Sequence, residues 1–220
     1  MKTLERGGRR TVLAVIVVAI LIGGGVAVVR RMTEPQTPGW PLTIAVVGDS
    51  YSAGRNNQVV WPTLLAQRTG WSVANFAQPD AGFVVDERGG HAFSYQVARA
   101  EQVHPRAVVI MTGAADAEVA FTGAVTQGAA DAIGKVKLSG VRPLIVGPTW
   151  YGTRIPEAVR SLSDQVRKAA DDAGVPFLNA LDPPWLTTDQ MQADLGGATD
   201  EGQSVIADKI AAWLRTELRQ

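Results

Sequence analysis

At 220 residues, the chain has room for one domain of ordinary size and an additional segment, and its 46% hydrophobic and 19% charged residues favour a packed core over disorder. The absence of cysteine and the presence of only two histidines exclude disulfides, cysteine nucleophiles and thiolate or histidine-rich metal sites, so no cofactor is expected. The zero net charge combines six Lys/Arg and one Glu in residues 1–31 with an acidic remainder, which argues against a nucleic-acid partner.

An uncharged run of 19 residues, 11–29 (TVLAVIVVAILIGGGVAVV), follows the basic residues 1–10. As a helix it would extend about 28 Å, enough to cross a hydrocarbon core. The positive-inside bias places residues 1–10 in the cytoplasm and the rest of the chain outside. The sequence therefore predicts a single-pass anchor in the cell membrane. The alternative is a cleaved signal peptide, which the length of the run and the arginines Arg30 and Arg31 directly after it disfavour.

Residues 30–40 contain two prolines and a glycine and little that a core would bury, which indicates a short, semi-rigid linker. The domain itself is expected over 41–220, at the outer side of the membrane in the cell envelope. Its abundance of Arg, Ala, Val and Gly is typical of a GC-rich bacterial genome.

From residue 41 onward, short apolar runs alternate with longer amphipathic stretches. The predicted strands are Leu42–Val47, Ser72–Phe76, Ala107–Met111, Leu144–Val146 and Phe177–Leu178. The predicted helices are Trp61–Arg68, Phe93–Val103, Val119–Val136, Pro156–Ala173 and a last one that Asp200 caps, running to about Leu218. This alternation predicts an α/β fold, a three-layer α/β/α sandwich with a five-stranded parallel sheet, whose ligands bind at the carboxyl ends of the strands.

The first predicted strand ends in Gly48-Asp49-Ser50, followed by Gly54. The glycines permit a sharp turn that would expose the serine hydroxyl at the top of the sheet. This block resembles the serine block of the SGNH (GDSL-type) hydrolases, and the resemblance extends over nearly all of 41–220. Other blocks agree with it after the first loop, after strand two and after strand four: Trp61-Pro62, Asn75-x-Ala77 and Val146-Gly147-Pro148-Thr149-Trp150.

The resemblance implies a flavodoxin-like α/β/α fold and hydrolysis or transfer of acyl esters, often on lipids or glycans. It places Ser50 in the position of the nucleophile. Asp80 falls where the family has its oxyanion glycine, unless Gly82 takes that role. The family asparagine, the third oxyanion donor, is replaced by Ala115 within the block 113–116 (GAAD).

The last family block, D-x-x-H-P-T-D-E-G-H, corresponds to residues 194–203 (DLGGATDEGQ). Asp194 retains the position of the carboxylate that orients the histidine. Gly197 occupies the position of the histidine itself, the general base. The resemblance thus implies a serine site that has lost its base and one oxyanion donor, and that is impaired in the family mechanism.

Two alternatives keep catalysis open. His91, in the loop after strand two, would be a substitute base if it reached Ser50. Alternatively, carboxylates at the strand ends would form an acidic pocket that acts as a base or binds a cation. For a ligand, the predicted binding residues are Gly48, Asp49, Asp80, Gly82, Gly113, Asp116 and Trp150.

The leading hypothesis is a pseudoenzyme that binds an acyl ester, a glycan or a protein at the cell envelope. The alternatives are an active serine esterase or acyltransferase with a non-standard base, and a purely structural partner of a membrane complex.

Overall fold

The computed structural model describes residues 42–86, 88–119 and 122–219. Five parallel strands form one sheet in the order β2-β1-β3-β4-β5. Their bounds are Thr43–Gly48 for β1, Ser72–Asn75 for β2, Ala107–Met111 for β3, Arg142–Val146 for β4 and Phe177–Leu178 for β5. The predicted α/β fold with a five-stranded parallel sheet is confirmed.

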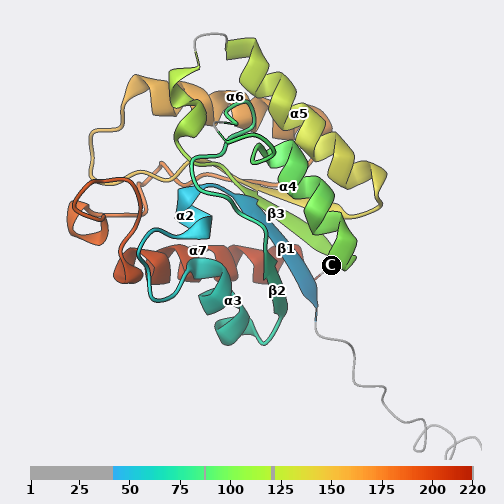
Figure 1. Cartoon of the computed structure of the whole chain (residues 1–220), viewed down its shortest axis with the longest axis horizontal. Coiled ribbons are helices and arrows are strands. Elements are labelled where there is room, and N and C mark those ends of the chain that lie inside the picture. The colour runs from blue at the N-terminus through green and yellow to red at the C-terminus, as the bar shows by residue number, and fades with distance from the viewer. Residues whose placement is uncertain (1–41, 87, 120–121, 220) are drawn as a thin grey trace, which may run out of the picture. The chain divides into compact units, whose positions relative to one another are not determined.

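Helices cover both faces of this sheet (Figure 1). Their bounds are Ser50–Ala53 for α2, Trp61–Thr69 for α3, Phe93–Ala100 for α4, Thr122–Leu138 for α5, Glu157–Ala173 for α6 and Asp200–Glu217 for α7. Three 3-10 turns accompany them: η1 (Glu101–Val103), η2 (Ala115–Glu118) and η3 (Thr188–Gln190).

Alternation along the strands divides the core into two layers. In β1, Ala45 and Val47 pack with α4, α5 and α6, while Ile44 and Val46 pack with α3 and α7. Figure 1 shows α3 and α7 beneath the sheet and the other long helices above it. The strand order reverses at β1, because β2 pairs with one edge of β1 and β3 with the other. In parallel sheets of this kind, a ligand binds at the carboxyl ends of the two strands between which the order reverses, here β1 and β3.

Several predicted boundaries shift by one to three residues in the structure, and two of the differences have a clear local cause. The helix expected over Phe93–Val103 divides into α4 and η1, and it stops at His104, whose left-handed φ of 47° precedes a proline that disfavours further helix. The last helix is capped by Thr199 rather than Asp200, because the Thr199 hydroxyl accepts a hydrogen bond from the Gly202 N–H.

Within the described residues, no helix is long and apolar enough to cross a membrane. The predicted anchor at 11–29 and the linker at 30–40 lie outside the described residues.

Candidate functional site

Ser50 lies at the start of α2, directly beyond the end of β1, and is 5% exposed. Asp49 caps this short helix, and its carboxylate accepts a hydrogen bond from the Tyr51 N–H at 3.0 Å. The turn is held from behind by Gln96 of α4, a fully buried side chain. Its amide accepts from the Gly48 N–H and donates to the Gly48 carbonyl, both at 2.9 Å. The serine is therefore fixed on rigid elements.

Asp80 is the direct partner of the Ser50 hydroxyl. The Asp80 N–H donates to Ser50 Oγ at 3.1 Å, and Oγ donates to Asp80 Oδ1 at 3.2 Å. Asp80 has a φ of 57°, in the left-handed region that glycine adopts most readily. Its backbone N–H is thus directed at the serine oxygen, and its carboxylate lies beside the same atom.

Gly82, the alternative for that role, has a different function. A Cβ built on Gly82 would lie 2.3 Å from the Asp116 carboxylate, so the glycine permits a close approach. That carboxylate accepts hydrogen bonds from the N–H groups of Phe83, Val84 and Val85 at 2.6, 3.1 and 2.9 Å. Asp116 was expected among the binding residues, but it lies outside the pocket lining and fastens the loop 83–85 instead.

Gly113 packs directly against the carboxyl group of Asp49. A Cβ on Gly113 would lie 1.5 Å from Asp49 Oδ2, so only glycine fits beneath this carboxylate. Ala115, at the position of the family asparagine, lines the pocket beyond Ser50 with a methyl group that donates no hydrogen bond. The side-chain donor that the resemblance places at this position is therefore absent.

Arg55 lies across the position that the resemblance assigns to the histidine. Gly197 is buried there, and a Cβ built on it would lie 3.9 Å from both Cβ and Cδ of Arg55. The Arg55 guanidinium pairs with Asp194 at 3.4 Å and donates to the Gly196 carbonyl at 3.5 Å. Asp194, whose side chain is 58% exposed, therefore orients an arginine instead of an imidazole.

Side-chain amides join the loop 55–58 to the loop 192–200. Asn57 donates to the Ala198 carbonyl at 3.0 Å and to Asp200 Oδ1 at 2.9 Å. Gln192 donates to the Arg55 carbonyl and, at 3.3 Å, to the Ala198 carbonyl. The Asp200 carboxylate thus accepts hydrogen bonds from the loop 55–58 instead of capping α7. These hydrogen bonds hold the two loops together.

His91 does not line the pocket of Ser50. Its backbone N–H donates to Asp86 Oδ1 at 2.7 Å, and its carbonyl accepts from Gln96 at 2.8 Å. Its Nδ1 is buried without a hydrogen-bond partner. The substitute base that the sequence left open is therefore held in the loop before α4, with no described contact to the serine.

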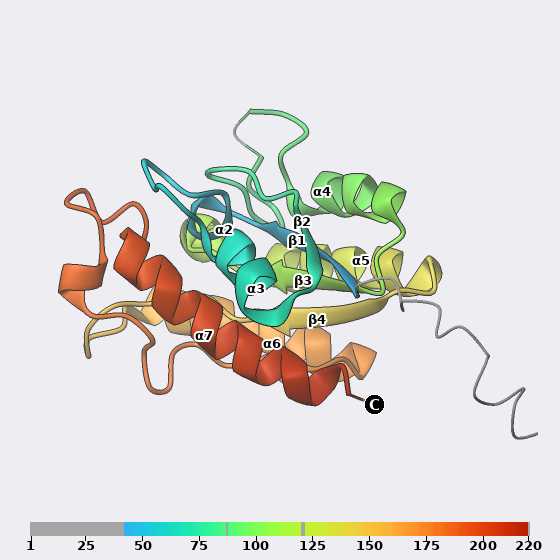
Figure 2. The same cartoon turned by 90° about the horizontal axis from the view of Figure 1, so that it is seen from below.

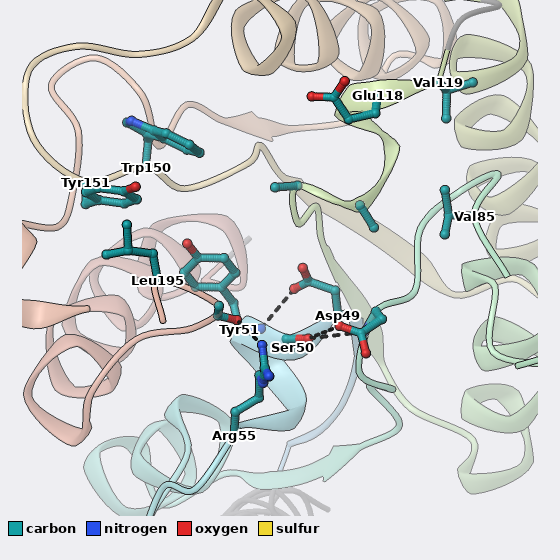
Figure 3. A pocket seen from close by; sticks show the side chains of 14 residues that line it. Asp49, Ser50, Tyr51, Arg55, Val85, Glu118, Val119, Trp150, Tyr151 and Leu195 are labelled. Atoms are coloured by element: carbon teal, nitrogen blue, oxygen red, sulfur yellow. Dashed lines mark hydrogen bonds between the residues drawn. The ribbon is translucent and has the colours of Figure 1, made fainter. Parts of the chain in front are cut away.

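A pocket of about 520 Å³ opens above Ser50. One wall is aromatic: the rings of Trp150 and Tyr151 stack with centroids 4.8 Å apart, beside Tyr51 (Figure 3). Among the described residues, the lining contains one cation, Arg55, and three carboxyl groups. These are Asp49, Asp80 and Glu118. The pocket can thus hold a flat apolar surface against the rings and hydrogen-bond donors against the carboxylates.

No group of three or more His, Asp or Glu suited to a metal ion occurs within the described part of the chain.

Burial raises the pKa of the Asp49 carboxyl from 3.8 to about 7, against the hydrogen bond from the Tyr51 N–H, which lowers it. The folded protein therefore holds this proton more tightly than the unfolded chain does. The contribution of Asp49 to the free energy of unfolding is therefore present in full below pH about 4 and is lost as the pH rises to about 7.

We expect Asp49→Asn to remove this pH-dependent fall in the free energy of unfolding. Urea unfolding of both proteins from pH 4 to 8 measures it, and equal pH dependence in the two proteins would contradict the raised pKa.

Two buried amides were not singled out in the sequence. Gln96 holds Gly48, and Gln203 accepts from the Trp61 N–H at 2.8 Å and donates to the Tyr51 carbonyl at 3.0 Å. Each is the single amide on an otherwise apolar helix face. Because a buried amide needs hydrogen-bond partners, this pattern could have indicated that both side chains hold the backbone of a neighbouring segment.

The GDSL-like Lipase/Acylhydrolase family model matches residues 46–203. Solved structures are also similar. A protein from Lactobacillus plantarum is 15% identical, with a TM-score of 0.67, over 80% of this chain and 97% of that one. The psychrotrophic esterase EstA from Pseudoalteromonas sp. is 20% identical, with a TM-score of 0.63, over 81% and 100%. A GDSL-like lipase from Bacteroides thetaiotaomicron is 15% identical, with a TM-score of 0.58, over 86% and 97%. No curated protein matches significantly.

Proposed function

This chain belongs to the GDSL-like lipase/acylhydrolase family, and on that premise we propose that it is a binding member of the family whose serine chemistry is impaired. The observation that carries the proposal is the surroundings of Ser50. Its hydroxyl is paired with Asp80, and the lining of its pocket contains no imidazole. Gly197 and Ala115 stand where the base and an oxyanion donor would be.

These losses outweigh what the site retains. Removing the histidine of a serine triad lowers kcat by about 10⁶, and removing one oxyanion donor lowers it by about 10²–10³. The negative charge of Asp80 beside Ser50 would further oppose a developing oxyanion. Turnover by the family mechanism is therefore negligible, although the retained serine turn and the open pocket support binding.

The lining favours an acyl ester or a glycan as the ligand. The stacked Trp150 and Tyr151 offer an apolar surface to an acyl chain or to the face of a sugar ring. Asp80 and Glu118 offer acceptors to hydroxyl groups. A protein segment that presents such groups is the third kind of ligand.

The location of this binding domain follows from the N-terminal sequence. The uncharged run 11–29 between clusters of arginine supports a single-pass anchor in the cell membrane, with residues 1–10 in the cytoplasm. The domain then lies on the extracytoplasmic side, in the cell envelope.

We expect the purified full chain to hydrolyse p-nitrophenyl butyrate no faster than Ser50→Ala does. The same compound should nevertheless bind, because its aromatic ring can lie against the stacked rings of Trp150 and Tyr151. Its nitroaromatic ring quenches the fluorescence of a tryptophan that it contacts, and this reports the binding. Quenching of tryptophan fluorescence should saturate with concentration, and Trp150→Phe should weaken it. Hydrolysis that exceeds buffer and disappears in Ser50→Ala would overturn the proposal, as would quenching that never saturates.

One observation favours a second candidate, an active serine esterase or acyltransferase. The 3.2 Å hydrogen bond from Ser50 Oγ to Asp80 Oδ1 has the geometry of a nucleophile and its base. Under this alternative Asp80→Asn, which keeps the size of the side chain, would abolish serine-dependent hydrolysis, while His91→Ala would not change it. A rate that survives Asp80→Asn would exclude this base.

A further inference from the structure

The amino ends of the strands form a second edge, opposite the pocket. Thr43 opens β1, and its carbonyl accepts from the Arg106 N–H at 2.8 Å beside the start of β3. Ala107 in turn pairs in register with Arg142, which opens β4. Helices that lead into these strands end at the same edge. We call the last turns and following loops the amino-end surface, consisting of residues 66–71, 101–106, 135–142, 171–176 and 214–219.

Positive charge gathers on this surface. It holds seven cationic residues, Arg68, Arg106, Lys135, Lys137, Arg142, Arg215 and Arg219. It holds four acidic residues, Glu101, Asp171, Asp172 and Glu217. The rest of 42–220 has the opposite balance, eight Lys/Arg and 15 Asp/Glu. Arg142 pairs with Glu217 and Arg68 pairs with Asp208 outside the surface, both at 2.9 Å, and an excess of positive charge remains at this end of an acidic domain.

The tip of this surface is apolar. Leu138, the last residue of α5, is 90% exposed, the highest value among the exposed large hydrophobic side chains of the described residues. Lys135 and Lys137 precede it and are exposed, and Val103, the last residue of η1 on the same surface, is 41% exposed. A single exposed leucine has no special meaning in itself. Exposed leucine and valine side chains on a surface with an excess of cations have the composition of a lipid-interface contact.

The length of residues 30–40 limits how far the start of β1 can be from the membrane, if the proposed anchor is correct. Residues 30–40 reach at most about 40 Å when extended and about 18 Å as a flexible chain. Both distances keep the start of β1 close to the head groups. From this reach, the charge and the apolar tip, we propose that the amino-end surface rests on the anionic phospholipid of the same membrane. The pocket then opens away from the bilayer.

The absence of cysteine in the chain permits a direct test. Leu138→Cys, labelled with an environment-sensitive NBD group, is placed as the full chain in nanodiscs of phosphatidylcholine with or without phosphatidylglycerol. We expect a blue-shifted emission and quenching by spin-labelled lipid when phosphatidylglycerol is present. Leu195→Cys, also exposed but on the pocket side, is the control. Its NBD group should show the emission of a water-exposed probe in nanodiscs of either composition.

Two readouts separate this inference from the anchor on which it rests. Copurification of the chain with nanodiscs reports the anchor, and its failure overturns both. A chain that copurifies, but whose residue 138 probe stays in water with phosphatidylglycerol, overturns the lipid contact alone.

A charge variant tests the cause of the contact. Lys135→Glu with Lys137→Glu should lower the ratio of lipid-contacting to detached domains at least about 30-fold, at about 1 kcal/mol for each charge removed. The matched control, Arg154→Glu with Arg160→Glu, changes the same charge at two exposed residues outside the surface and should leave the ratio within twofold. Equal effects of the two pairs would contradict a specific surface.

Discussion

Gly197→His combined with Ala115→Asn should raise the hydrolysis of p-nitrophenyl butyrate at least about 100-fold over the unmodified chain. The space around Gly197 permits this change. A Cβ there meets only Arg55, at 3.9 Å, and the φ of Gly197 is not in the left-handed region. Ser50 and its turn are already in place. The double variant thus restores a base for the serine and a donor for the oxyanion.

Arg55 limits the size of this gain, because it pairs with the Asp194 carboxylate that would have to orient the new imidazole. Adding Arg55→Ala should therefore increase the rate again and move the acid limb of the pH profile. Ser50→Ala in the same background is the control and should return the rate to background. An unchanged rate in a folded double variant would mean that more than these two groups was lost.

Asp116→Ala should lower the free energy of unfolding by about 3 kcal/mol or more, because up to three buried or half-buried N–H groups would lose their acceptor. The loop 83–85 carries part of the pocket lining through Val85, so we also expect weaker binding of p-nitrophenyl butyrate. Urea unfolding measures the first effect and tryptophan quenching the second.

Asp131→Ala is the matched control for this variant. Asp131 is an exposed carboxylate of α5 that accepts one hydrogen bond from Gln127, and its loss should change stability by less than about 0.5 kcal/mol. Similar losses in both variants would show that Asp116 does not hold the loop.

The sequence predicted the features that depend on local pattern. Apolar runs bounded by turns gave the five strands, and the Gly48-Asp49-Ser50 block located the serine at the end of β1. The order of the blocks also predicts Gly197, Ala115 and Asp80 at positions where the family has other residues. These predictions needed only neighbouring residues and the order of the blocks.

The sequence could not predict what depends on contacts between distant residues. Arg55 and Asp194 are 139 positions apart, and nothing local indicates that they pair. The direction of the Asp116 carboxylate depends on the path of the loop 83–85. The choice between Asp80 and Gly82 depends on a backbone dihedral angle, which composition does not reveal.

The joined loops 55–58 and 192–200 affect how quickly and how tightly a ligand can bind. In enzymes that close over a substrate, loop ordering subtracts from affinity and slows association. Here the amides of Asn57 and Gln192 complete that ordering when the protein folds. If the proposed binding is correct, we therefore expect a ligand to meet loops that are already ordered, and we expect the protein to select ligands by their shape without induced fit.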